Sequence, residues 1–205
     1  MLNKEELIEW LENETMVLRT KELKDAFMKI DRKDFTPIDY IEEAYEDYPL
    51  PLQNTGQTIS QPTTVAFMLE LLNPRKGEKI LDIGSGSGWT TALLARLVGK
   101  EGKVIGIERI QELVELGQMN IEKYDFKNAE IRQTEKEIGL PQEAPFDKIL
   151  VSAAAKDLPK ELVKQLKVGG IMVIPINDEV WQVRKLKNSE DIKKHKGFVF
   201  VPLIT

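Results

Sequence analysis

The chain has 205 residues, with 29 lysines and arginines against 34 aspartates and glutamates and a formal net charge of −5. It has no cysteine and one histidine, His195, which excludes thiol catalysis, disulfides, cysteine-ligated zinc and multi-histidine sites, so we expect no metal. The length predicts one domain, 1–205, with a short appendage. The net acidity argues against nucleic acid and anionic membranes as partners.

The sequence contains no targeting or membrane signal that we recognise. Its apolar runs are far shorter than the ~20 residues of a membrane span, and its first residues do not resemble a signal peptide. We therefore expect a soluble, cytoplasmic protein. A monomer is favoured, although the sequence does not show the oligomeric state.

Residues 1–56 predict a helical N-terminal extension that leads into a loop. Asn3 followed by Glu6 has the capping-box pattern of a first helix. A second helical stretch places apolar residues 23, 26, 27 and 30 on one face. A third helix follows Pro37 and should end before Pro49, because a proline disfavours helical backbone in the residue before it.

Residues 57–205 alternate between strand-like and helix-like patterns. Strand-like apolar runs lie at 79–83, 104–107, 129–132, 148–151 and 171–174. Helical spacing separates them, and the last predicted helix carries Leu158, Leu162 and Leu166 and is closed by Gly169-Gly170.

Strand–helix alternation with short turns predicts a parallel sheet covered by helices on both faces. Two further segments, 180–186 and 198–203, predict an antiparallel hairpin with a charged connection between them. The predicted fold class is α/β, with a doubly wound, mostly parallel seven-stranded sheet and the helical extension.

A glycine-rich turn, 82–88, follows the first predicted strand and precedes a helix. Glycines allow a tight turn and a close ligand, and open α/β sheets bind ligands at this position. Glu108, twenty residues after Gly88, ends the second strand, where a carboxylate can accept hydrogen bonds from both ribose hydroxyls. The combination predicts a nucleotide-type ligand, and the alternative is a glycine-rich connection without one.

The spacing of the turn is G-x-G-x-G, and Trp89 occupies the position of the last glycine in a dinucleotide fingerprint. Asp82 places a negative charge beside the turn, which favours a cationic ligand such as S-adenosylmethionine over the pyrophosphate of NAD. The alternative for Asp82 is a carboxylate that only binds the loop's own N–H groups. Trp89 either lines the site or packs in the core.

Three further stretches carry a resemblance to a known family. Tyr48-Pro49-Leu50-Pro51 with Gly56-Gln57-Thr58-Ile59-Ser60-Gln61-Pro62 resembles the substrate loop of protein-L-isoaspartate O-methyltransferases. Residues 146–170 resemble that family's fourth strand and following helix, and 200–203 its C-terminus. The turn 81–88 resembles the first motif of class I S-adenosylmethionine-dependent methyltransferases.

The resemblance implies an activity, a cofactor and a partner. The enzyme would transfer the methyl group of S-adenosyl-L-methionine to the α-carboxylate of isoaspartyl residues in damaged proteins. The ester then cyclises to a succinimide, which hydrolyses partly to aspartate. A carboxylate is already ionised at neutral pH and the sulfonium is its own leaving group, so orientation remains as the enzyme's task.

The resemblance also implies site residues by position. Ser60 would hold the substrate carboxylate as the catalytic residue, and its alternative is a helix N-cap before Pro62. The implied substrate-binding residues are Gln57, Thr58, Ile59 and Ser60. The implied cofactor-binding residues are Asp82, Gly84, Ser85, Gly86, Ser87, Gly88, Glu108 and Glu135.

Thr134-Glu135-Lys136 stands where family members usually carry Gly-Asp-Gly near the adenine, so both glycines are missing. This departure keeps two alternatives open: a methyltransferase for a different peptide carboxylate, and a non-catalytic member that binds cofactor or damaged protein. A third, an NAD oxidoreductase, is disfavoured by Asp82 and Trp89. The basic stretch 184–196 is interpreted as a solvated connection between two strands rather than a nucleic-acid surface.

Overall fold

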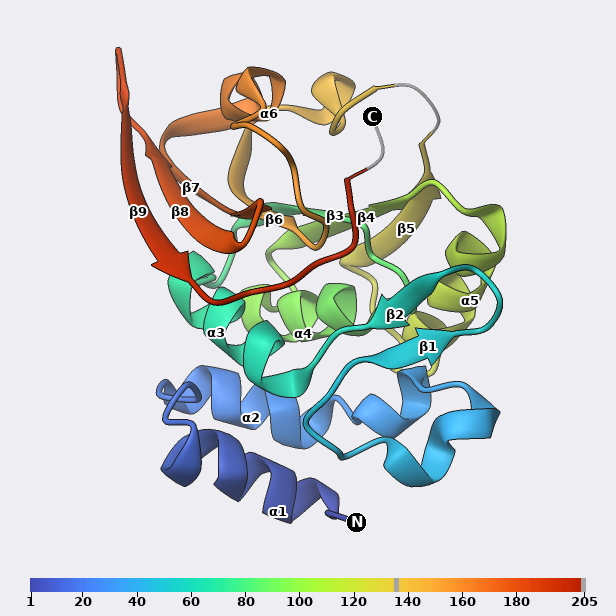
Figure 1. Ribbon diagram of the computed structural model, residues 1–205. Helices are drawn as coiled ribbons and strands as arrows, with labels where there is room; N and C mark the ends of the chain where they lie inside the picture. The colour runs from blue at the N-terminus through green and yellow to red at the C-terminus, as the bar shows by residue number, and fades with distance from the viewer. Residues whose placement is uncertain (135–136, 204–205) are drawn as a thin grey trace.

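A seven-stranded sheet forms the centre of the computed structural model, which describes residues 1–134 and 137–203 (Figure 1). The strand order is β5-β4-β3-β6-β7-β8-β9, in which β8 and β9 are antiparallel to their neighbours and all other pairs are parallel. The strands are β3 (Lys79–Ile83), β4 (Lys103–Glu108), β5 (Ala129–Gln133), β6 (Phe146–Val151), β7 (Leu166–Ile176), β8 (Glu179–Lys185) and β9 (Glu190–Lys196). The predicted fold class is confirmed.

Helices cover both faces of this sheet. One face carries α3 (Pro62–Leu72), α4 (Trp89–Val98) and α5 (Gln111–Glu122), and the other carries α6 (Lys160–Gln165). The chain runs from β3 to β4 on one side and returns to β6 on the other, so the strand order reverses between β3 and β6. In sheets of this kind the reversal opens a crevice at the carboxyl ends of the strands.

The N-terminal extension is helical, as predicted. It contains α1 (Lys4–Glu9), a π-helical turn (Trp10–Glu14), α2 (Lys21–Lys29) and two 3₁₀ helices (Arg32–Phe35 and Ile38–Glu43). The capping box at Asn3 is present, with Glu6 N–H donating to its side chain at 2.9 Å. The third helix is 3₁₀ rather than α, and it ends before Pro49.

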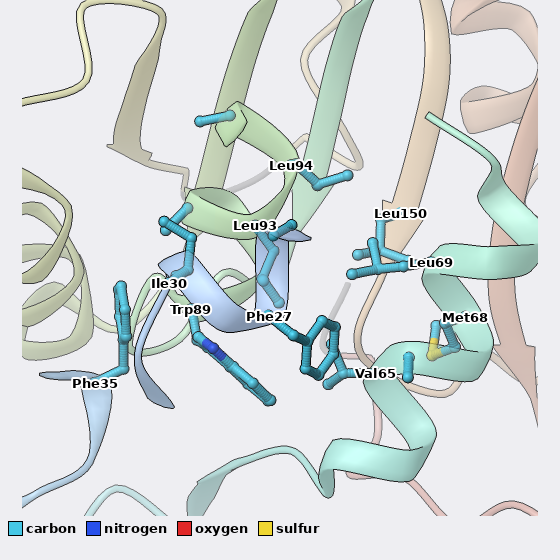
Figure 2. Packing of buried hydrophobic residues seen from close by; sticks show 14 of the residues in the cluster. Phe27, Ile30, Phe35, Val65, Met68, Leu69, Trp89, Leu93, Leu94 and Leu150 are labelled. Carbon is cyan, nitrogen blue, oxygen red and sulfur yellow. The ribbon is translucent and has the colours of Figure 1, made fainter. Parts of the chain in front are cut away.

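The extension packs on the helices of the sheet through one apolar layer. Figure 2 shows Phe27 of α2 beside Trp89 and Leu93 of α4, with Met68 of α3 close by. The rings of Phe27 and Trp89 meet edge to face, with centroids 5.6 Å apart. Because aromatic side chains bury large apolar areas, this contact fixes the extension against the start of α4.

A short hairpin connects the extension to the sheet. Its strands, β1 (Leu50–Leu52) and β2 (Gln57–Ile59), pair antiparallel and are followed directly by α3. Pro62 occupies the first turn of α3, where a missing N–H costs nothing, and Asn73 ends the helix in left-handed conformation with φ of 51°. The hairpin therefore reaches from the extension towards the carboxyl ends of the strands.

Two predictions for the C-terminal third are wrong. The last helix ends at Gln165, because Leu166 pairs with Phe146 as the first residue of β7, and Gly169-Gly170 lies inside that strand. The hairpin partner of β8 is β9, which is the basic segment predicted to be a solvated connection. An edge strand with one solvated side can carry many lysines, so the charged residues of β9 hid the apolar alternation that would have predicted a strand.

The segment predicted to be a strand, 198–203, instead runs back over the sheet. The N–H of Ala154 donates to Val201 O and the N–H of Leu203 donates to Ala154 O, both at 2.8 Å. This segment therefore lies beside the turn that follows β6 (Figure 1). Within residues 1–134 and 137–203, no helix has both the length and the apolar character to cross a membrane.

Candidate active site

A cavity of ≈ 380 Å³ lies at the carboxyl ends of β3, β4 and β6. Its walls include the glycine turn after β3, the end of β4, residues 57–60 and the C-terminal segment 199–203. The cavity coincides with the reversal in strand order, where open α/β sheets bind their ligands.

The glycine turn uses backbone conformations that suit glycine. Gly84, Gly86 and Gly88 have φ of 76°, 51° and 88°, a region that side chains disfavour. The N–H groups of Gly84 and Ser85 donate to Ile107 O at 2.9 and 3.2 Å, so the turn is tied to β4. The residues of the turn that line the cavity are Gly84, Ser85, Gly86 and Ser87.

Gly88 has a different place from the other glycines. It is the N-cap of α4 and faces α5 rather than the cavity, and a Cβ here would lie 3.0 Å from Gly117 O. Gly88 therefore permits close packing of two helices, which positions the N-terminus of α4 beside the cavity. Such a terminus offers unpaired N–H groups to a ligand.

Glu108 lines the cavity at the end of β4 and is only 9% exposed. One carboxylate oxygen, Oε2, accepts from Gly86 N at 3.1 Å, and the other, Oε1, accepts from the N–H groups of Arg109 and Ile110 at 2.7 and 3.1 Å. A carboxylate has about four lone-pair sites and three are used here, so Glu108 is fixed in orientation and still has capacity for a ribose hydroxyl.

Asp82 lies behind the turn, fully buried, and does not line the cavity. Its Oδ2 accepts from the hydroxyls of Thr90 and Thr91, each at 2.7 Å, while Oδ1 has no hydrogen-bond partner within the part of the chain that the structure describes. Burial raises the pKa of Asp82 to about 6, against the lowering effect of the two hydroxyls. In the structure the Asp82 carboxylate thus binds the first turn of α4, and among the described residues it accepts from no N–H group of the loop. Its predicted role in cofactor binding stays a prediction.

The predicted substrate residues Gln57, Thr58, Ile59 and Ser60 all line the cavity. The N-cap of α3 is Gln61, so the alternative interpretation of Ser60 as a cap is wrong. Among the described residues, the Ser60 hydroxyl has no hydrogen-bond partner. Its carbonyl accepts from Arg32 Nη2 at 3.2 Å. The Ser60 hydroxyl is thus available to a ligand, while its backbone carbonyl is held by the Arg32 guanidinium.

Trp89 combines the two roles that the sequence left open. It begins α4, is 3% exposed, lines the cavity on one side and packs against Phe27 on the other. Glu135 lies outside the described residues, so its predicted contact with the adenine stays a prediction. Its neighbours Thr134 and Glu137 line the cavity.

Sequence reasoning assigned no role to several residues of the site. Ser152 and Ala153 follow β6 and line the cavity, as do Ile138 and Gly139 and the segment 199–203. The position of Ser152 after a buried strand was a usable indication, since carboxyl ends of parallel strands meet at one edge. No local sequence pattern indicated that Arg32 contacts the site. Among the described residues, no group of three or more histidine, cysteine, aspartate or glutamate side chains forms a metal site.

The strand order, the two antiparallel strands at its end and the glycine turn paired with Glu108 define a class I S-adenosylmethionine-dependent methyltransferase. A family model described as protein-L-isoaspartate(D-aspartate) O-methyltransferase matches residues 2–205. The chain therefore belongs to the protein-L-isoaspartate O-methyltransferase family. This membership also sets aside the NAD oxidoreductase alternative.

Individual relatives agree with the family model. The chain is similar to the protein-L-isoaspartate O-methyltransferase of Ignicoccus hospitalis, with 45% identity over 206 residues, covering 98% of this chain and 97% of that one. The Methanopyrus kandleri enzyme is 44% identical over 193 residues, covering 91% and 85%. The Plasmodium falciparum beta-aspartate methyltransferase, crystallised with S-adenosyl-L-homocysteine, superposes with a TM-score of 0.87 at 28% identity, covering 100% of this chain and 99% of that one.

Proposed function

We infer that this chain transfers the methyl group of S-adenosyl-L-methionine to the free α-carboxylate of L-isoaspartyl residues in damaged proteins. One observation carries the inference: the Ser60 hydroxyl and the glycine turn, which the family uses for substrate and cofactor, line the same cavity. The two reactants would therefore meet in one space, as a direct transfer requires.

The residues present fit the cofactor. The cavity has the size of a small-molecule site. At its wall, Ser85 Oγ is a buried polar atom that has no hydrogen-bond partner among the described residues. Gly84, Ser85, Gly86 and Ser87 would hold the methionine part, and Glu108 the ribose. Asp82 and Gly88 would act indirectly, through the first turn of α4 and its packing on α5.

When bound, S-adenosyl-L-methionine supplies an electrophilic methyl group whose leaving group is a neutral thioether. The substrate carboxylate is ionised at neutral pH, so this chain needs no general base. Ser60 would donate its hydroxyl hydrogen bond to that carboxylate and so orient it. Residues 57–59 would hold the neighbouring backbone of the substrate, and Trp89 with the C-terminal segment would exclude water from the cavity.

The experiment that tests this function is methyl transfer from labelled S-adenosyl-L-methionine to an isoaspartyl peptide beside its aspartyl twin. Base-labile label on the isoaspartyl peptide alone is the expected result. Label on another carboxylate would support the alternative of a different peptide substrate. Binding of S-adenosylhomocysteine in calorimetry, with transfer to neither peptide nor other acidic peptides, would support a non-catalytic member.

We propose further that 1–205 acts as one domain and as a monomer in the cytoplasm, without nucleic acid. The contact of Phe27 with Trp89 supports one folding unit, because it joins the extension to α4. One cooperative unfolding transition and a light-scattering mass of one chain are expected. Two separate transitions, or a dimer mass, would contradict this proposal.

A further inference from the structure

Arg32 is a buried cation in the N-terminal extension that the mechanism above does not use. It begins the 3₁₀ helix Arg32–Phe35 and is 2% exposed. Its guanidinium donates four hydrogen bonds, and all four acceptors are backbone carbonyls. Nη1 donates to Ala44 O and Glu46 O at 2.8 and 3.0 Å, and Nη2 donates to Tyr48 O and Ser60 O at 3.0 and 3.2 Å.

These bonds join two segments at one point. Residues 44–48 lie near the end of the extension, and Ser60 lies 28 positions after Arg32 at the cavity wall. Both segments meet at Nη2, since it donates to Tyr48 and to Ser60. A guanidinium is planar and its N–H directions are fixed, so it holds the carbonyls in a defined relation that a flexible ammonium cannot reproduce.

The same guanidinium also lies beside a second residue of the cavity wall, Trp89. Its Cζ lies 5.4 Å from the ring centroid of Trp89, which lines the cavity at the start of α4. Arg32 therefore contacts two walls, the loop with Ser60 and the helix that follows the glycine turn. Burial lowers the pKa of Arg32 to about 10, so the side chain is still charged at neutral pH.

Ser60 has few other constraints on its orientation. It follows a two-stranded hairpin of three residues per strand, and the N-cap residue Gln61 makes no side-chain capping bond. The next anchors of the loop are Gln61, whose Nε2 donates to Asp47 O at 2.9 Å, and Thr63, whose N–H and hydroxyl donate to the Asp47 carboxylate at 2.9 and 2.6 Å. The peptide at Ser60 itself is held by Arg32.

We propose that Arg32 is a positioning residue for methyl transfer, which fixes the Ser60 peptide relative to Trp89 and the glycine turn. The extension then belongs to the catalytic apparatus, because the guanidinium that holds the Ser60 peptide comes from it. This proposal rests on the role proposed for Ser60.

The test compares Arg32→Lys and Arg32→Met with a matched arginine, Arg96→Met. Arg96 also joins the extension to α4, through its ion pair with Asp25 at 2.6 Å, but it is exposed and does not line the cavity. For each full-length variant, kcat and KM for the isoaspartyl peptide and the dissociation constant for S-adenosylhomocysteine would be measured well below the melting temperature.

Both Arg32 variants are expected to lose kcat, by about 10- to 100-fold, since a small misplacement of a reacting group has costs of this order. Binding of S-adenosylhomocysteine should change less than about threefold, because the glycine turn is tied to β4 independently. Arg96→Met should keep the wild-type kcat. If Arg32→Met does not fold, Arg32→Lys carries the comparison, since it keeps the charge.

A double-mutant cycle separates positioning from a merely structural role. If Arg32 acts through Ser60, Arg32→Lys should lower kcat much less in a Ser60→Ala background than in the wild type. Equal losses in both backgrounds, or a wild-type kcat in Arg32→Lys, would overturn the proposal. An inactive wild-type enzyme would instead overturn the proposed function, so the two failures are distinguishable.

Discussion

The glycine turn and the substrate loop form two walls of one cavity, but they are held by different kinds of contacts. The turn is fixed by its immediate surroundings, through backbone bonds to Ile107 and the carboxylate of Glu108. The loop at Ser60 is fixed from Arg32, a residue of another layer. Local backbone chemistry thus builds the cofactor side, and a long-range buried cation supports the substrate side. Variants on the two sides should therefore fail differently.

The largest expected effect is on the substrate side. Ser60→Ala should lower kcat by about 10²-fold or more, equivalent to roughly 3 kcal/mol, the usual cost of removing one precisely placed donor. Affinity for S-adenosylhomocysteine should stay near the wild-type value in calorimetry. Ser189→Ala, in the turn between β8 and β9, is the matched control. Wild-type turnover in Ser60→Ala would remove Ser60 from its role.

The second expected effect is on the stability of the cofactor side, where the contribution of Asp82 depends on pH. Because burial raises the folded-state pKa of Asp82 to about 6, from 3.8, the folded protein binds this proton more tightly than the unfolded chain. The contribution of Asp82 to stability is therefore present at low pH and is lost as pH rises from about 4 to about 6, by up to roughly 3 kcal/mol.

The measurement is the free energy of unfolding of wild type and Asp82→Asn, by denaturant titration at several pH values. Asn keeps the shape but does not ionise, so the difference between the two proteins should shift in favour of Asn over this pH range. A difference independent of pH would mean that the pKa of Asp82 is the same in the folded and unfolded protein.

The third effect separates backbone strain from packing in the turn. Gly88→Ala and Gly77→Ala both place a side chain at positive φ, 88° and 81°, at a cost of ~1–2 kcal/mol. Only at Gly88 does the new Cβ meet backbone, at 3.0 Å from Gly117 O. Thermal unfolding should show the larger loss of stability for Gly88→Ala. This variant should also bind the cofactor more weakly. Equal losses would show that α4 and α5 adjust freely.

The smallest expected effect is on Thr63, a further anchor of the substrate loop. Thr63→Val removes a hydroxyl bond to Asp47 and should cost ~1 kcal/mol of stability. It should lower kcat by less than about tenfold, because the Arg32 contact remains. Thr20→Val, which removes a surface bond to Glu70, should cost similar stability with no loss of kcat. A larger loss than for Arg32→Lys would make Thr63 the main anchor.

The sequence allowed most of the sheet to be predicted, because parallel strands buried on both faces are continuous apolar runs. The run 79–83 agrees with β3 at both ends, and the other parallel strands are longer than predicted. The edge strand β9 was missed, since a strand with one solvated side carries lysines and loses its apolar pattern. The segment 198–203 was predicted as a strand in its place, because residues 199–203 are apolar for another reason, namely that they line the cavity.

The sequence by itself determined the alternation of strands and helices, the glycine turn and the position of Glu108, because each depends on residues close together in the chain. Tertiary structure alone decided which polar groups reach the cavity. Asp82 lies behind the turn because Thr90 and Thr91 bind its carboxylate there. Arg32 supports Ser60 because packing of the extension on α4 brings them together across 28 positions. No local pattern encodes such a contact, since its energy arises only once distant segments have packed and excluded water.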